Sequence, residues 1–99
     1  MTVPEQMNFI ETLKQGGPEV MRLNTGSVPQ PRDDEVLIRV MAASVNYPDV
    51  LQRMGSYPLP HCVSPVIGLD VAGEVVATGR AVKSVNSGEM VCALTNGGG

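Results

Sequence analysis

Residues 42–57 read AASVNYPDVLQRMGSY and mark a corner where a long apolar strand gives way to a short helix. Asn46 is a residue type favoured at a helix N-cap, and Pro48 suits the first helical turn, where its missing N–H costs nothing. Asp49 is favoured at the positive end of a helix, and Gly55 can end it. The pattern therefore predicts a capped helix between Asn46 and Gly55. Taken alone, such a helix is typical of a protein surface and needs no catalytic duty.

The segment before this corner, residues 35–44, gives the clearest strand pattern of the chain. Both of its faces are largely apolar, with Val36, Ile38, Val40 and Ala42 on one face and Leu37, Met41 and Ala43 on the other. A strand with two apolar faces is typical of the interior of a sheet. We therefore expect this strand to be central.

Short strands separated by turn residues make up the rest of the chain. We expect strands at residues 7–14, 20–24, 70–77 and 90–94. Turns or connections are expected at residues 16–18, 28–34, 58–65 and 95–99, which are rich in glycine or proline. Within residues 70–77, Gly73 would permit a close backbone approach or a bulge. Many short strands and one short helix predict a mostly β domain.

The composition limits the classes of function. With 99 residues, 42% of them hydrophobic and 17% charged, the chain fits one small folded domain. The net charge is −3 and the basic residues are scattered, so the footprint of nucleic-acid binding is missing. No apolar run approaches the roughly 20 residues that span a bilayer, and no signal-peptide pattern opens the chain. We therefore expect a cytoplasmic protein without nucleic-acid or membrane partners.

The cysteines do not indicate a redox or metal motif. Cys62 and Cys92 are far apart and form no C-x-x-C pair. His61 lies beside Cys62, but nothing nearby in the sequence would orient the two side chains for nucleophilic chemistry. Two reduced thiols are expected.

Five ordered motifs resemble one family. The corner contains Val45-Asn46-x-x-Asp49 followed by Arg53-x-Gly55-x-Tyr57, a run that resembles the N-terminal part of zinc-free quinone oxidoreductases of the medium-chain dehydrogenase/reductase superfamily. Four further stretches agree in order and spacing: Gly16-Gly17-Pro18-Glu19-Val20, residues 34–40, Pro65-x-x-Gly68-x-Asp70-x-x-Gly73-x-Val75, and Gly88-Glu89-x-Val91. The resemblance covers nearly the whole chain and is closest to the NADPH:quinone oxidoreductase branch.

The resemblance implies a fold more specific than the strand pattern does. It implies a GroES-like, partly open β-barrel with one short helix, the substrate-side catalytic domain that packs against a Rossmann domain in the full enzymes. Residues 1–99 would be an incomplete copy of that domain. The glycines at 97–99 open a turn in the family that continues into further strands, so we expect the domain to be truncated at its C-terminal end and the Rossmann cofactor domain to lie outside this chain.

The same resemblance implies the absence of zinc. Zinc alcohol dehydrogenases of the superfamily carry a Cys where this chain has Asn46 and a His-Glu pair where it has Leu69-Asp70. A catalytic zinc usually needs three protein ligands from Cys, His or carboxylate side chains. With two ligand positions altered, the resemblance implies a zinc-free reductase.

The implied activity is hydride transfer from NADPH to a quinone or an enone. On this resemblance Asn46 and Leu69 would contact the cofactor and Tyr57 would line the substrate side of the cleft. The full-length enzyme would be a homo-oligomer, whereas the 99-residue chain alone would be inactive. Two alternatives stay open: a fragment of an enoyl-thioester or enone reductase, and a free-standing GroES-like interaction module.

Each of these residues also has a purely structural interpretation. Asn46 can be only a helix cap, and Tyr57 only a half-buried packing residue. Asp49 suits capping better than general-base duty, since a carboxylate in a first helical turn is held in its charged form. Asp70 and Glu74 share one strand face, where we expect solvated polar side chains and not a paired acid and base.

Overall fold

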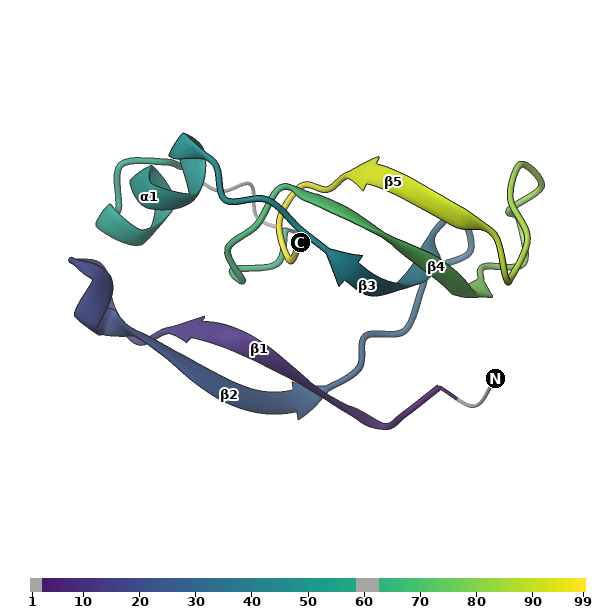
Figure 1. Cartoon of the computed structure of the whole chain (residues 1–99), viewed down its shortest axis with the longest axis horizontal. Coiled ribbons are helices and arrows are strands. Elements are labelled where there is room, and N and C mark those ends of the chain that lie inside the picture. The colour runs from purple at the N-terminus through teal and green to yellow at the C-terminus, as the bar shows by residue number, and fades with distance from the viewer. Residues whose placement is uncertain (1–2, 59–62) are drawn as a thin grey trace.

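The computed structural model describes residues 3–58 and 63–99, and its elements form two antiparallel sheets. The first is a hairpin of β1 (Gln6–Thr12) and β2 (Met21–Ser27). The second is a three-stranded sheet in the order β3-β4-β5. Its strands are β3 (Val36–Ala42), β4 (Asp70–Thr78) and β5 (Met90–Leu94). One α-helix, α1 (Tyr47–Met54), follows β3 (Figure 1). The mostly β class with one short helix is confirmed.

The hairpin differs slightly from the expected strands. Its register runs from Gln6 opposite Ser27 to Thr12 opposite Met21. The first strand therefore ends two residues before the expected position 14, and the second begins one residue later than expected. Val20, predicted to open that second strand, lies instead in a 3₁₀ turn over Pro18–Val20 and is 4% exposed. The Val20 carbonyl accepts the N–H of Leu13 and closes the hairpin.

The expectation that residues 35–44 form a central strand is wrong for the sheet that the structure describes. In that sheet β3 pairs with β4 only, and β4 is the middle strand. Val40 and Met41 of β3 are 50% and 60% exposed. The periodicity of apolar residues reports which faces could be covered, whereas the position in the sheet depends on hydrogen-bonding neighbours, which lie in the strand plane. The pattern of β3 carries no information about that second property.

Gly73 in the middle of β4 confirms the expected close approach. A Cβ atom built on Gly73 would lie 2.1 Å from the backbone carbonyl oxygen of Arg39 in β3. The β3–β4 register also shifts between Leu37 and Ile38 and between Val40 and Ala42. The irregular β3–β4 pairing and the glycine therefore occur together, as expected for a glycine inside a strand.

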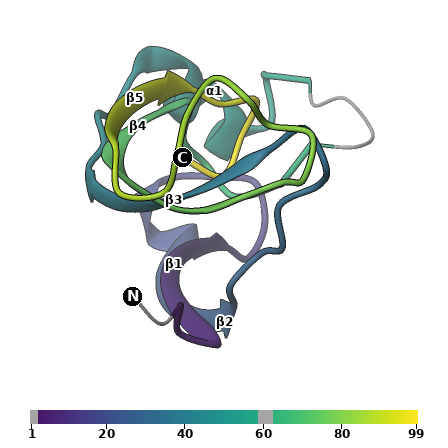
Figure 2. The ribbon, with the colours of Figure 1, turned by 90° about the vertical axis from the view of Figure 1, so that its right-hand side faces the viewer.

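The hairpin lies along one side of the three-stranded sheet, with α1 at one end of the molecule (Figures 1 and 2). A cavity of about 450 Å³ lies between them, lined by Met7 and Val28 from the hairpin side and by Ile38 and Val71 from the sheet. Among the apolar side chains of the described ranges, only three are buried: Val20, Val71 and Val75. The arrangement is a partly open barrel with a thin apolar interior.

The predicted helix is confirmed at both ends. Asn46 occupies the N-cap with extended backbone angles, and Gly55 ends the helix with φ of +87°, in the left-handed region that favours glycine. No helix in residues 3–58 or 63–99 is long and apolar enough to cross a membrane.

Candidate functional site

The cap of α1 uses backbone groups of Asn46 and the side chain of Asp49. The Asn46 N–H donates to Asp49 Oδ2 over 2.8 Å, and the Asp49 N–H donates to the Asn46 carbonyl over 3.0 Å. Asp49 is 6% exposed, and its other carboxylate oxygen has no hydrogen-bond partner. These contacts agree with the structural interpretation of Asp49 as a capping residue.

The side chain of Asn46 takes part in the capping box of α1 and also makes contacts outside the helix. Its Nδ2 lies 3.1 Å from Ser44 Oγ and 3.1 Å from Asp70 Oδ2, both of which accept hydrogen bonds from it. Asn46 therefore connects three segments of the chain: the end of β3, the start of α1 and the start of β4. We call Ser44, Asn46 and Asp70 the corner cluster.

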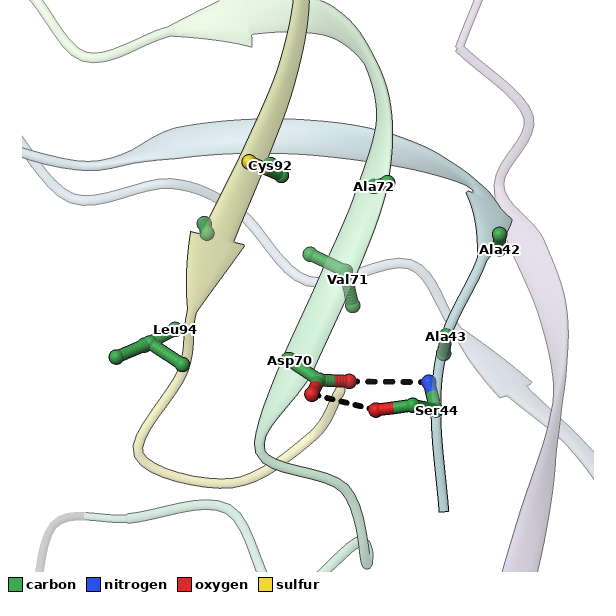
Figure 3. Close-up of a pocket in the computed structure, with 9 residues that line it drawn as sticks. Ala42, Ala43, Ser44, Asp70, Val71, Ala72, Cys92 and Leu94 are labelled. Carbon is green, nitrogen blue, oxygen red and sulfur yellow. Dashed lines mark hydrogen bonds between the residues drawn. The ribbon is translucent and has the colours of Figure 1, made fainter. Parts of the chain in front are cut away.

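Asp70 is the acceptor on which the corner cluster converges. Its Oδ1 accepts the backbone N–H of Ser44 over 3.0 Å, and its Oδ2 accepts the Ser44 hydroxyl over 2.6 Å (Figure 3). The hydroxyl bond from Ser44, the backbone bond from Ser44 and the amide bond from Asn46, in that order of size, lower the pKa of Asp70 below its ordinary value. The carboxylate is therefore charged at neutral pH, because each of these donors favours the ionised form.

Asp70 is accessible to solvent, as expected, but it also accepts hydrogen bonds from other segments of the chain. Three donor groups from two other segments hold it. Glu74, four residues after Asp70 on the same strand face, pairs instead with Arg39 across the β3–β4 ladder, with 3.1 Å between Glu74 Oε1 and Arg39 Nη2. The two carboxylates thus have separate partners, and the expectation that they do not work as an acid–base pair fits this arrangement.

A shallow depression of about 530 Å³ adjoins the corner cluster (Figure 3). Apart from Ser44 and Asp70 its lining is small or apolar, and comes from Ala42, Ala43, Val71, Ala72, Cys92, Ala93 and Leu94. Cys92 is a free, exposed thiol. The arrangement combines one charged end with an apolar floor, a pattern that suits a mostly apolar ligand carrying a few polar groups.

The structure brings two of the three predicted site residues to one corner. Leu69 directly precedes Asp70, is half-buried, and its carbonyl accepts the N–H of Thr95 over 2.7 Å. Tyr57 lies three residues beyond the C-terminal end of α1 and is 37% exposed. Asn46 caps the other end of this eight-residue helix, whose ends are about 12 Å apart. Tyr57 and Asn46 therefore follow and precede opposite ends of α1.

The sequence pattern does not single out Ser44, and it assigns Asp70 no partner. Asp70 is 26 residues from Ser44 and 24 from Asn46. The one feature that these residues share in the sequence is their position at the ends of secondary-structure elements. Ser44 follows an apolar strand, and Asp70 begins another. Such positions collect functional side chains, but the pairing appears only in the folded chain.

Within the ranges that the structure describes, no group of three or more His, Cys, Asp or Glu side chains is placed to hold a metal ion. His61 and Cys62, which the sequence placed in a proline-flanked loop, lie outside those ranges.

Comparisons with known proteins identify the family of the domain. The alcohol dehydrogenase GroES-like domain matches residues 32–98. A quinone oxidoreductase of Sus scrofa is 42% identical over 86 residues, which cover 86% of this chain and 26% of the relative. An Arabidopsis thaliana protein named NADPH-dependent alkenal/one oxidoreductase, chloroplastic, is 36% identical and matches 93% of this chain and 24% of its own length.

A solved structure supports the same assignment. The crystal structure of Escherichia coli quinone oxidoreductase complexed with NADPH superposes with a TM-score of 0.79 and 32% identity, over 91% of this chain and 28% of that chain. The chain belongs to the family of alcohol dehydrogenase GroES-like domains, and within the medium-chain dehydrogenase/reductase superfamily it matches quinone oxidoreductases. It spans about a quarter of the length of the curated relatives it matches.

Proposed function

We propose that this chain is the substrate-side domain of a longer NADPH-dependent oxidoreductase that reduces quinones. The observation that supports the proposal is the corner cluster, in which Asn46 is hydrogen-bonded to Asp70, the residue that follows Leu69. The similarity to quinone oxidoreductases supports it. On this proposal a Rossmann domain outside these 99 residues supplies the other wall of the cleft.

The residues at the corner fit the nicotinamide end of NADPH. Asn46 is half-buried, and its amide nitrogen donates to Ser44 and Asp70. The Leu69 carbonyl is taken by Thr95, so Leu69 can offer an apolar side-chain contact. Bound NADPH supplies the hydride. The domain holds the ring, and its apolar surface helps to keep water away from it.

The pyrophosphate needs a partner domain. Within residues 3–58 and 63–99 all strand pairs are antiparallel, so the parallel βαβ unit that binds a dinucleotide is not found there. We therefore expect the isolated chain to bind NADPH weakly and to reduce no quinone, and the longer protein to do both. Calorimetric titration of each with NADPH and NADH, with a quinone assay, tests this. Turnover by the 99 residues alone would contradict the proposal, and so would a longer protein that binds neither nucleotide.

We propose that the reaction needs no zinc. Asn46 and Leu69 stand where metal-dependent members of the superfamily carry ligands, and here the Asn46 amide is engaged with Asp70. Elemental analysis after dialysis should find much less than one zinc per chain. One tightly held zinc would contradict the proposal and would direct attention to His61, Cys62 and Cys92.

An enone is the second candidate acceptor, since one relative is named as an alkenal/one oxidoreductase. A conjugated enone and a quinone both present a carbonyl next to a carbon–carbon double bond, so one domain wall can serve either. Comparing kcat/KM of the longer protein for a soluble quinone and for a simple enone separates the two, because that ratio reports differential transition-state binding. Tyr57 is our candidate for the substrate side, and Tyr57→Phe should change this ratio more than it changes the affinity for NADPH.

Two further expectations concern the setting of the enzyme. We propose a cytoplasmic location and a homo-oligomeric longer protein. For the 99-residue chain, exposed apolar residues on the edge strand β5, such as Leu94 at 89%, predict concentration-dependent self-association. Two findings would favour the alternative of a free-standing interaction module: tight binding of a protein partner by this domain, and a protein in which no cofactor domain is joined to it.

A further inference from the structure

The chain contains one Asn-Gly step, Asn96–Gly97, in the segment that follows β5. An asparagine can lose ammonia when the backbone nitrogen of the next residue attacks the side-chain carbonyl carbon, Cγ. Glycine favours this attack, because it has no Cβ to crowd the nitrogen and adopts backbone angles that other residues avoid. Gly97 has φ of +137°, and the chain bends at both residues. Whether the fold permits the reaction depends on the hydrogen bonds of the two groups.

The other four asparagine side chains are held by hydrogen bonds. Asn24 Oδ1 accepts the backbone N–H of Thr25 over 2.8 Å, so the nitrogen that would attack is already bound. Asn86 Nδ2 donates to Glu89 Oε1 over 3.3 Å. The remaining two, Asn8 and Asn46, are also hydrogen-bonded through their side chains. The structure therefore restrains the carboxamide at each of these four positions.

Asn96 differs from these four residues. Its side chain is exposed and makes no hydrogen bond to any residue within 3–58 or 63–99. Within the same ranges the Gly97 N–H has no backbone acceptor, whereas the N–H groups of Thr95 and Gly98 on either side are both hydrogen-bonded. The two groups that would react thus lie unpaired between two anchored residues.

We propose that Asn96 is a site of spontaneous deamidation. The Gly97 nitrogen forms a bond to Asn96 Cγ, the Cγ–Nδ2 bond breaks, and Nδ2 leaves as ammonia with the proton that Gly97 gives up. Water then opens the cyclic imide at one of its two carbonyls and gives aspartate or isoaspartate. The net charge of the chain changes from −3 to −4, because a neutral amide becomes a carboxylate. This inference does not rest on the proposed function.

Isoaspartate would also change the backbone at this point. Its main chain runs through Cγ, which adds one atom between residues 96 and 97. Beyond that atom the Gly98 N–H donates to the Val66 carbonyl over 2.8 Å. The Gly99 N–H donates to the Gly68 carbonyl over 3.1 Å, where the end of the chain lies beside the stretch that leads into β4 (Figure 1). We expect the added atom to break these two bonds, while the Thr95 bond, which precedes it, survives.

The close approach of the two stretches supports this expectation. A Cβ built on Gly68 would lie 2.3 Å from the Gly99 carbonyl oxygen, so the backbones are packed directly against each other. A Cβ built on Gly97 would lie 2.6 Å from the Ser64 carbonyl oxygen. The segment therefore has little room to absorb a longer backbone without moving away from residues 64–68.

The reaction is tested by incubating the folded chain and following its peptides by mass spectrometry. The Asn96 peptide should convert at least about tenfold faster than the Asn86 peptide, because the Cβ of Ser87 crowds the attacking nitrogen there. The rate should rise by up to about tenfold per pH unit, because the nitrogen must lose its proton to attack. Asn96→Gln is the matched control, since it keeps the amide but needs a larger ring, and it should not convert. Equal conversion at Asn86, or none at Asn96, would overturn the proposal.

The same incubation in guanidinium chloride separates the effect of the fold from that of the sequence. An unpaired surface segment needs almost no free energy to open, so the rate at Asn96 in the folded chain should stay within about tenfold of the unfolded rate. The Asn24 peptide should convert faster once its hydrogen bonds are lost. Circular dichroism checks that the chain is folded without denaturant. Conversion of Asn96 in denaturant alone would contradict the proposal, because the fold would then protect it.

The backbone consequence is tested by hydrogen exchange on the isoaspartate form, isolated by chromatography. NMR should show that the amides of Gly98 and Gly99 lose protection while Thr95 keeps it. Asn96→Asp is the matched control, because it adds the same charge without the extra backbone atom and should keep all three amides protected. Protected Gly98 and Gly99 amides in the isoaspartate form would refute this consequence. Loss of protection in Asn96→Asp would refute it as well, since charge alone would then explain the change.

Discussion

The two halves of strand β4 differ in what holds them. In the middle, Gly73 and Val75 face the interior, with Val75 1% exposed, and they are held by close packing. At the start, Asp70 is held by hydrogen bonds from Ser44 and Asn46. Packing in the middle of β4 requires only the correct alternation of small and apolar residues. The hydrogen bonds at its start require the end of β3, the start of α1 and the start of β4 to come together. Close packing and side-chain hydrogen bonding are therefore separated along one strand, and substitutions should separate their effects on stability too.

The largest effect is expected at Gly73. Gly73→Ala places a Cβ 2.1 Å from the Arg39 carbonyl, and since the obstacle is backbone the β3–β4 ladder must shift. We expect a loss of about 3 kcal/mol in the free energy of unfolding, at the upper end for overpacking. Urea denaturation measures it. Gly88→Ala is the matched control, because at φ of +96° its Cβ meets nothing within 4 Å. It should lose only the strain of a left-handed residue, about 1 kcal/mol. Equal losses would contradict the close-approach argument.

The next effect tests the apolar interior. Val75→Ala removes two methyl groups from a fully buried side chain, which should lower the free energy of unfolding by about 2 kcal/mol through lost burial and a small cavity. Val40→Ala removes the same atoms from a side chain that is 50% exposed and should lose less than about 1 kcal/mol. If thermal and urea denaturation found the two variants alike, the assignment of β4 as the interior strand would fail.

A small effect is expected at the Arg39–Glu74 pair. The two side chains are 51% and 24% exposed, so solvent screens their attraction. A double-mutant cycle with Arg39→Gln and Glu74→Gln should give a coupling below about 1 kcal/mol that falls further at high salt. A larger, salt-independent coupling would mean that this pair is as organised as the corner cluster, and the contrast between the two would be lost.

The corner cluster also predicts a pH dependence of stability. The folded pKa of Asp70 is lowered, so the unfolded chain binds this proton more tightly than the folded chain. Its stabilising contribution is therefore complete above the ordinary pKa near 3.8 and is lost as the pH falls through the folded value. Asp70→Asn should lose that contribution at neutral pH and differ less from the wild type at pH 2. A difference that grows on acidification would have the wrong sign.

The sequence predicted the bounds of individual helices and strands better than it predicted which elements contact one another. The cap and stop signals at Asn46 and Gly55 are local, so the helix was predicted with the observed ends. Strand β5 was also predicted at its observed bounds. The edge position of β3 was not predicted, because hydrogen-bonding neighbours leave no trace in the alternation of one strand.

The candidate site was predictable only in part. The family motifs pointed to Asn46 and Leu69, which lie at the corner. The partners that orient Asn46 could not be found by spacing, since Asp70 is 24 residues away and its hydrogen bonds depend on how β4 starts beside the end of β3. Local sequence patterns predict local structure. A cluster of residues from three separate segments can be recognised only in the folded structure.

The most direct test of this account is the titration of the Asp70 side-chain carboxyl in the folded chain, followed by carbon NMR of the labelled aspartates. The corner cluster predicts an Asp70 pKa below its ordinary value near 3.8, shifted upward by Ser44→Ala, which removes the hydroxyl donor at 2.6 Å. An Asp70 that titrates at or above its ordinary value, or that does not respond to Ser44→Ala, would contradict the account.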